Sequence, residues 1–282
     1  MNQARIVVLG SLNMDMVLRV PHFPVAGETL LGHDLRHVPG GKGGNQAVSC
    51  ARQGAAVRLL SCVGEDAYGA QLLTALRSDG IDVSHVQQVR DASTGVAVIS
   101  VDDAGQNQIV VMAGANQQLR VPEVQLKSLL GDADFVVLQF ETPLSEVNQA
   151  LQIARQAGCK VALNPSPFHA LEESWWSAID VLVVNETEAK GLSTIEVDSP
   201  ANAAQAARFL HAKGIAQVVV TLGSSGAVVC DATGVRWHEA VVVKAVDTTA
   251  AGDTFLGALT VQLAQGATLD DATQWAMRAA SI

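Results

Sequence analysis

The sequence predicts an α/β fold in which helices cover both faces of a mostly parallel sheet. Five runs are apolar at nearly every position, and segments with helical periodicity separate them along the chain. Strands of this kind must be buried on both faces, as in a parallel sheet between two helical layers. Two stretches, about 14–38 and 93–112, alternate apolar and polar residues and predict antiparallel strands with one solvated face. We therefore expect a three-layer αβα sandwich with a small β-sheet lid.

The predicted elements alternate regularly after a first strand that opens at Arg5. The later strands are expected at Val57–Cys62, Phe135–Leu138, Lys160–Leu163, Val181–Val184 and Val218–Thr221. The helices are expected at Asn45–Gln53, Tyr68–Ser78, Leu144–Gln156, Ala201–Lys213 and Gly252–Leu263. No internal repeat, low-complexity segment or linker interrupts this order, so residues 1–282 are expected to form one domain.

Composition limits the classes of function. The 282 residues are 49% hydrophobic, and the net charge of -10 argues against nucleic acid, whose phosphate backbone needs a basic face. Without an 18-residue apolar run or a charged and apolar leader, we expect neither a membrane span nor a signal peptide. Cys50, Cys62, Cys159 and Cys230 are far apart, which predicts reduced core thiols in a cytoplasmic protein rather than disulfides or a metal site.

Polar or glycine-rich residues follow four of the predicted strands. In open parallel sheets, ligands bind beyond the carboxyl ends of the strands. The residues found there are Glu141, Asn164-Pro165-Ser166-Pro167, Asn185-Glu186-Thr187-Glu188 and Gly223-Ser224-Ser225-Gly226. Each group alone could be a simple turn, but four of them at one sheet edge predict an active-site cleft.

A glycine cluster, Gly40-Gly41-Lys42-Gly43-Gly44, precedes Asn45 and a helical segment. Its spacing fits neither a Walker A loop nor a dinucleotide fingerprint. It is either a flexible entry to the helix or a place where the backbone approaches a polyhydroxyl ligand, with the Asn45 amide as a further partner. Asn13 and Asp15 follow the first strand and could bind further hydroxyls, although such a pair can also mark a turn.

The segment VDTTAAGDTF places Asp253 directly after Ala250, Ala251 and Gly252, at the start of an apolar helix. Unpaired N–H groups at a helix N-terminus stabilise negative charge on a transferring phosphoryl group. An adjacent carboxylate could accept a proton from an attacking hydroxyl. The alternative is that Asp253 only caps the helix, for which Ala-Ala-Gly is a poor lead-in.

Several of these segments resemble the signatures of the ribokinase-like (PfkB) carbohydrate kinases: VDTTAAGDTF, GGKGGNQA, NETE and TLGSSG. The likeness runs from Val7 to about Ala280. It implies an α/β body with a β lid and ATP-dependent phosphorylation of a sugar hydroxyl in the presence of Mg²⁺. GSLNMD, LQFETP and LNPSP are most similar to the family's ribose-phosphorylating members, which implies phosphorylation of D-ribose at O5.

The resemblance also implies a role for each matching residue. The residues that would bind the sugar are Asn13, Asp15, Gly41, Lys42, Gly43, Asn45, Glu141 and Asp253. Ala250, Ala251 and Gly252 would form the anion hole, and Asp253 would be the catalytic base. The nucleotide and its phosphates would contact Asn185, Glu188, Thr221, Leu222, Gly223, Ser224, Ser225, Gly226, Gly252 and Met277.

Asp247 and Thr249 match positions that bind an activating monovalent cation, usually K⁺. Members of the family continue beyond the position of Ile282 with a loop that completes the cation site. Residues 269–282 have helical spacing with no Gly or Asn after it, so we expect a C-terminally truncated chain and an incomplete cation site. Family members commonly dimerise through the lid, which implies a homodimer.

Other functions remain open from the sequence. The chain could phosphorylate 2-deoxyribose or another pentose, although Asn13 with Asp15 favours a fully hydroxylated ring. It could also be a non-catalytic relative that only binds sugar or nucleotide. A dinucleotide-dependent oxidoreductase is disfavoured because the chain has no G-x-G-x-x-G and no catalytic His or Tyr constellation.

Overall fold

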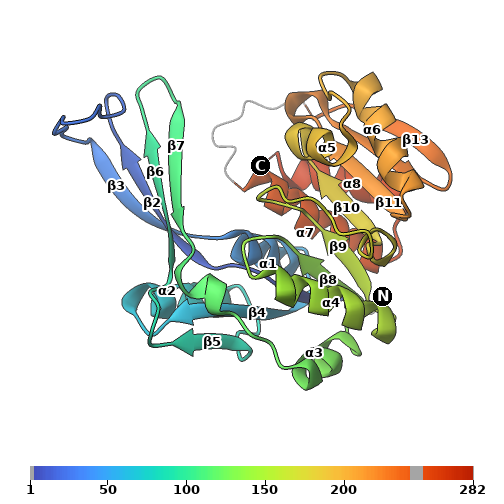
Figure 1. Ribbon diagram of the computed structural model, residues 1–282, viewed down its shortest axis with the longest axis horizontal. Helices are drawn as coiled ribbons and strands as arrows, with labels where there is room; N and C mark the ends of the chain where they lie inside the picture. Colours follow the sequence, from blue (N-terminus) through green and yellow to red (C-terminus); the bar gives the residue numbers. More distant parts are fainter. Residues whose placement is uncertain (1–2, 242–249, 282) are drawn as a thin grey trace.

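The computed structural model describes residues 3–241 and 250–281, and in this part of the chain nine strands form one sheet between two helical layers (Figure 1). The strand order is β13-β12-β11-β10-β9-β8-β1-β4-β5. The strands are β1 (Arg5–Leu9), β4 (Ala56–Gly64), β5 (Val86–Val89), β8 (Phe135–Leu138), β9 (Lys160–Leu163), β10 (Val181–Val184), β11 (Gln217–Thr221), β12 (Ala227–Asp231) and β13 (Gly234–His238). Neighbours from β11 to β5 pair in parallel, whereas β12 and β13 form an antiparallel edge. The predicted fold class is confirmed.

Helices pack on both faces of this sheet. One layer contains α1 (Lys42–Arg52), α2 (Ala67–Ser78), α7 (Ala251–Ala264) and α8 (Leu269–Ala279), and the other contains α3 (Glu123–Leu130), α4 (Leu144–Ala157), α5 (Glu186–Ser193) and α6 (Pro200–Ala212). Successive strand residues point to opposite faces, so Ile6 and Val8 pack under the first layer while Val7 and Leu9 pack under the second. Each such buried side chain contributes roughly 1.5–3 kcal/mol.

A second, four-stranded sheet stands out from one side of the body (Figure 1). Its order is β3-β2-β6-β7, with β2 (Asn13–Arg19), β3 (Asp34–Gly40), β6 (Gly95–Val101) and β7 (Asn107–Met112). The β2–β3 and β6–β7 pairs are antiparallel as predicted, but β2 and β6 pair in parallel, so that part of the prediction is wrong. The reason is that both strands leave the body side by side, with Asn13 opposite Gly95.

Helix α1 begins at Lys42, three residues earlier than the predicted start at Asn45. Gly43 and Gly44 therefore belong to its first turn rather than to a loop, although glycine is a poor helix former. Close packing explains them, because a Cβ at Gly43 would lie 2.5 Å from the Gly10 carbonyl carbon. The hairpin of β12 and β13 was not predicted from the sequence.

The cysteines lie in the core, as predicted. All four are free and buried, and burial raises the pKa of the Cys50 thiol to about 12. Over the described ranges 3–241 and 250–281, none of the helices has the length and apolar character needed to span a bilayer.

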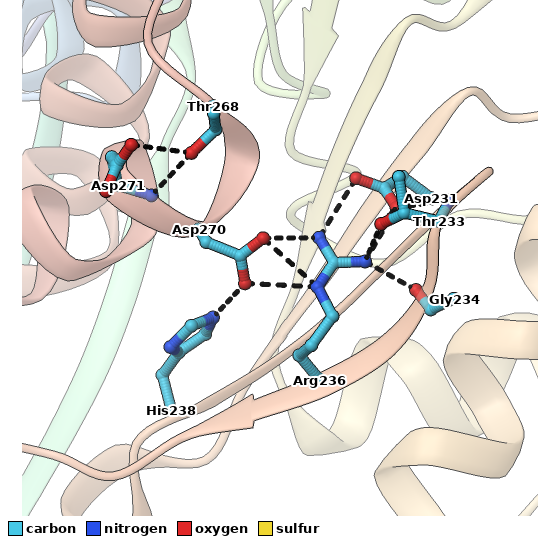
Figure 2. Close-up of polar contacts among 8 residues, drawn as sticks. All are labelled: Asp231, Thr233, Gly234, Arg236, His238, Thr268, Asp270 and Asp271. Carbon is cyan, nitrogen blue, oxygen red and sulfur yellow. Dashed lines mark hydrogen bonds and ion pairs between the residues drawn. The ribbon is translucent and has the colours of Figure 1, made fainter.

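Arg236 ties the β12–β13 hairpin to α8. Figure 2 shows its guanidinium group between Asp231 of β12 and Asp270 of α8, with N–O distances of 2.6 and 2.7 Å. His238 Nε2 lies 2.7 Å from the second carboxylate. Hydrogen bonds from Arg236 hold the pKa of both carboxyl groups below the usual value. Depressed carboxyl pKa values stabilise the fold above about pH 4 and lose that effect as the pH falls below it.

We expect Arg236→Met to lower the free energy of unfolding at pH 7 by about 1 to 2 kcal/mol, because two charge-assisted contacts are lost at a partly exposed site. The variant should also lose less stability than the wild type as the pH falls below about 4. Denaturant unfolding across pH measures both effects. Arg90→Met is the matched control, since Arg90 pairs with Glu65 on the open surface. This substitution should lower the free energy of unfolding by less than about 0.5 kcal/mol. Equal losses in the two variants would contradict the stabilising role of Arg236.

Candidate active site

The N-terminus of α7 is built without a side-chain cap from the residue before it. Ala250 occupies the N-cap position with φ 59°, a left-handed conformation that costs an Ala roughly 1–2 kcal/mol. It has no side-chain oxygen that could accept from the first-turn N–H groups of Ala251, Gly252 and Asp253. A Cβ built at Gly252 would meet no atom of the described residues 3–241 and 250–281 within 4 Å, apart from its neighbours in the same helix. This terminus has the features of an anion-binding site.

Asp253 is not a helix cap, and that alternative is wrong. The residue lies in the first turn of α7, is only 6% exposed, and directs its carboxylate at α1. Its Oδ1 accepts from Gln46 Nε2 at 2.8 Å, and its Oδ2 accepts from Asn45 Nδ2 at 3.2 Å. Lys42 Nζ lies 3.9 Å from Oδ1. The carboxylate is therefore held between two helices and is paired with donors, as a buried charge requires.

Glu141 connects the end of β8 to the start of α1. Its Oε2 accepts from the backbone N–H of Lys42 at 3.1 Å and from the Ser11 hydroxyl. Gly41, which precedes the helix, has φ 86°. A side chain from another element thus caps α1 and holds its glycine-rich end against the turn after β1.

The first residues of β2 face the same site. Asn13 is buried, and its Oδ1 accepts from Asn116 Nδ2 at 2.8 Å, while its own Nδ2 donates to no described residue. Asp15 is partly buried. Burial, followed by the negative charges of Glu141 and Asp253, raises the pKa of Asp15 to about 6. Asp15 therefore lies close enough to both other carboxylates to be influenced by their charges.

The structure brings six predicted residues into one cluster: Asn13, Asp15, Lys42, Asn45, Glu141 and Asp253. Gly41 and Gly43 lie in its wall, at the start of α1. Sequence reasoning missed four polar residues that orient the cluster: Ser11, Gln46, Asn116 and Gln139. A signal existed for two of them, because Gln46 directly follows Asn45 and Gln139 lies two positions before Glu141.

Asn185 and Glu188 occupy the N-terminus of α5, where they form a reciprocal capping box. The Asn185 Oδ1 atom accepts from the Glu188 N–H at 2.8 Å, and Glu188 Oε2 accepts from the Asn185 N–H at 3.1 Å. Asn164 Nδ2 also donates to Glu188 Oε2, at 3.2 Å. Both residues thus have a structural role, and both lie at the carboxyl edge of β10.

The loop after β11 lies next along the same edge. The Thr221 hydroxyl donates to the Val184 carbonyl oxygen at 3.3 Å, and Gly223–Ser225 form a short 3₁₀ turn. Gly226 has φ 95°, and a Cβ there would lie 2.0 Å from the His238 carbonyl oxygen, so only glycine fits. Leu222 is buried, whereas Gly223, Ser224 and Ser225 are exposed. From β8 to β11 there are three strand spacings, or about 14 Å.

Three further predicted residues are not part of this cluster as the structure describes it. Met277 of α8 is partly buried and packs against the core under α7 and α8. Asp247 and Thr249, the predicted cation ligands, lie outside the described residues. Within the described part of the chain, no three His, Cys, Asp or Glu side chains are grouped to hold a metal ion.

A cavity of about 630 Å³ adjoins the cluster at Asn45 and Ala250. The rest of its wall comes mostly from α1 and α2, and neither Asp253 nor Glu141 lines it. The candidate site is therefore the polar cluster at the sheet edge, where the chemistry-bearing groups converge.

Comparison with known proteins agrees with this architecture. The family described as pfkB family carbohydrate kinase matches residues 3–282, and the chain belongs to that family. It is 42% identical to a ribokinase of Haemophilus influenzae, over 98% of this chain and 91% of the relative. It is 35% identical to a deoxyribokinase of Salmonella typhi, over 89% of this chain and 83% of the relative. The structure of Arabidopsis thaliana ribokinase complexed with ribose and ATP matches with a TM-score of 0.92 and 30% identity, over 99% of this chain and 92% of that one.

Proposed function

We propose that this protein uses ATP to phosphorylate D-ribose at O5, giving D-ribose 5-phosphate and ADP. The observation that carries the proposal is the buried carboxylate of Asp253 in the first turn of α7, a helix whose N-cap residue Ala250 has no capping side chain. A carboxylate and an anion-binding helix end, held on one turn, are the two groups that phosphoryl transfer to an alcohol needs. The ribokinase relatives support ribose as the sugar.

The reaction follows from the positions of these groups. Asp253 accepts the proton of the O5 hydroxyl while O5 forms a bond to the γ-phosphorus and the bond to the β–γ bridging oxygen breaks. The N–H groups of Ala251, Gly252 and Asp253 stabilise the charge on the transferring phosphoryl group. ADP leaves with the electron pair of the broken bond.

The sugar is held by both acceptors and donors. The carboxylates of Asp15 and Glu141 accept from sugar hydroxyls, and the amides of Asn13 and Asn45 add donors. A site built to pair hydroxyls leaves charged acceptors unpaired when a hydroxyl is missing. This favours ribose over 2-deoxyribose.

ATP lies along the carboxyl edge of the sheet, from the anion site to the loop Thr221–Gly226, with Met277 beside the base. Mg²⁺ bound to the phosphates would offset their charge, and Glu188 at the start of α5 would hold its water shell. Asp247 and Thr249 are the proposed K⁺ ligands. The buried free thiols fit a reducing, cytoplasmic compartment.

A coupled assay of ADP release with a panel of sugars, with and without K⁺, tests the function. We expect ribose to support turnover with a kcat/KM about 10- to 100-fold above that of 2-deoxyribose, because the missing hydroxyl leaves a carboxylate unpaired. Asp15→Ala is the matched variant and should narrow this difference. Equal or better turnover of 2-deoxyribose would contradict the sugar assignment, and thermal stabilisation by sugar without any ADP release would indicate the non-catalytic alternative.

We also propose that the small sheet acts as a lid and as the contact surface of a homodimer. All six residues of β7 are exposed, and Ile109, Val110, Val111 and Met112 range from 45% to 62%. Since successive residues point to opposite faces, both faces of this strand present apolar side chains. Exposed apolar surface of this kind is typical of protein contacts.

The dimer can be tested with two neighbouring substitutions. Ile109→Lys and Val110→Lys place a charge on opposite faces of β7, so we expect only the one on the contact face to give monomers. Light scattering coupled to size exclusion measures the mass of each variant and of the wild type. A monomeric wild type would overturn the proposal.

A further inference from the structure

A chain of two buried amides ends on Asp253. Gln46 of α1 donates through Nε2 to Asp253 Oδ1 at 2.8 Å, and Gln139, just beyond β8, donates through Nε2 to Gln46 Oε1 at 2.6 Å. The side chains of Gln46 and Gln139 are fully buried. The three residues come from α1, the end of β8 and α7, so the chain crosses the centre of the fold. We call these two glutamines the amide relay.

The direction of the amide relay is set by the charge of Asp253. An ionised carboxylate can only accept, so Gln46 must present its NH₂ group to it and turn its carbonyl oxygen toward Gln139. Gln139 must then present its own NH₂ group. Its Oε1 is left beside Gly10, where a Cβ would lie 2.2 Å away, and no described residue donates to it. A reversed Gln139 would instead place two carbonyl oxygens together.

The unpaired Oε1 of Gln139 indicates why the amide has this orientation. A buried acceptor without a partner is destabilising, and the fold retains one because the alternative breaks the relay. A glutamine kept only for packing has no reason to be held in this orientation. The two amides therefore hold the Asp253 carboxyl group through Oδ1, the oxygen that accepts from Gln46.

We propose that Gln46 and Gln139 are positioning residues that hold the Asp253 carboxylate through Oδ1 and leave its Oδ2 as the atom that accepts the sugar proton. Oδ1 is occupied by Gln46, with Lys42 Nζ 3.9 Å away. Oδ2 has, among the described residues, only the longer contact of 3.2 Å with Asn45. The proposal rests on the proposed function for the identity of the proton donor.

The surroundings explain why such a relay is needed. Among the described residues, Lys42 of α1 places its Nζ 3.9 Å from Asp253 Oδ1, and Asp15 of β2 lies close enough to interact with the charges of Asp253 and of Glu141 after β8. The Asp15 carboxylate disfavours a further negative charge beside it, while Lys42 favours it. Amide donors that bond the ionised form offset this repulsion without adding a second cation.

The direct test is a titration of the Asp253 carboxyl carbon by NMR, with the signal assigned through Asp253→Asn. Gln46→Met keeps the length of the side chain and removes the donor, so its titration midpoint should rise by about one pH unit. Gln139→Met should raise it in the same direction by less, because Gln46 is then free to turn. This measurement needs no substrate and no turnover.

The kinetic test uses the pH profile of kcat/KM with ribose and ATP, which reports on the free enzyme as the NMR titration does. In each variant, the acid limb should move upward by as much as the NMR midpoint of that variant. Ser49→Ala is the matched control, because Ser49 Oγ donates to the Thr254 carbonyl oxygen at 2.8 Å, which also joins α1 to α7 without touching the carboxylate. This control should lower Tm and leave the midpoint and the acid limb in place.

Unchanged midpoints in Gln46→Met and Gln139→Met would overturn the amide relay, and Gln139→Met alone decides if the first variant does not fold. A lower Tm with an unmoved midpoint would show a purely structural role and also overturns it. Absence of ribose-dependent turnover in the wild type would contradict the proposed function instead, and the NMR titration would still decide the relay.

Discussion

The contact between α1 and α7 that buries the Asp253 carboxylate is the constraint on which the rest of the site depends. A buried charge must be paired, and among the described residues the side chains that pair with it come from one face of α1. Helix α1 must therefore approach the end of β1 closely, and the glycines at its start permit this approach. Glu141 then caps the helix from β8, so the same contacts that fix α1 bring a second carboxylate into the site.

The small sheet depends on the same arrangement. Its strand β2 begins at Asn13, whose amide is held by Asn116 just beyond β7. The partner strand β6 begins at Gly95, where a Cβ would lie 2.2 Å from Asn13 Oδ1. The base of the projecting sheet and the sugar-facing end of the site are therefore built from the same residues. A movement of this sheet would act on the site through Asn13 and Asp15.

Much of the fold could be predicted because its signals are local. Strands apolar on both faces indicate a covered parallel sheet, and α7 matched its predicted range to within one residue at each end. The start of α1 could not be predicted, because tertiary packing outweighs the poor helix propensity of glycine there. The parallel pairing of β2 with β6 joins segments far apart in sequence. Gln46 and Gln139 lie beside predicted site residues, but their hydrogen bonds could not be predicted, because the partners lie 207 and 93 positions away.

The most direct test of this account is the turnover of Asp253→Asn with ribose and ATP, with ribose binding followed by calorimetry. Asparagine can still accept from Gln46 through its carbonyl oxygen, so the fold and sugar binding should survive. We expect kcat to fall by about 10²–10⁴ while ribose still binds. Near-normal turnover in this variant would contradict the assignment of Asp253 as the base.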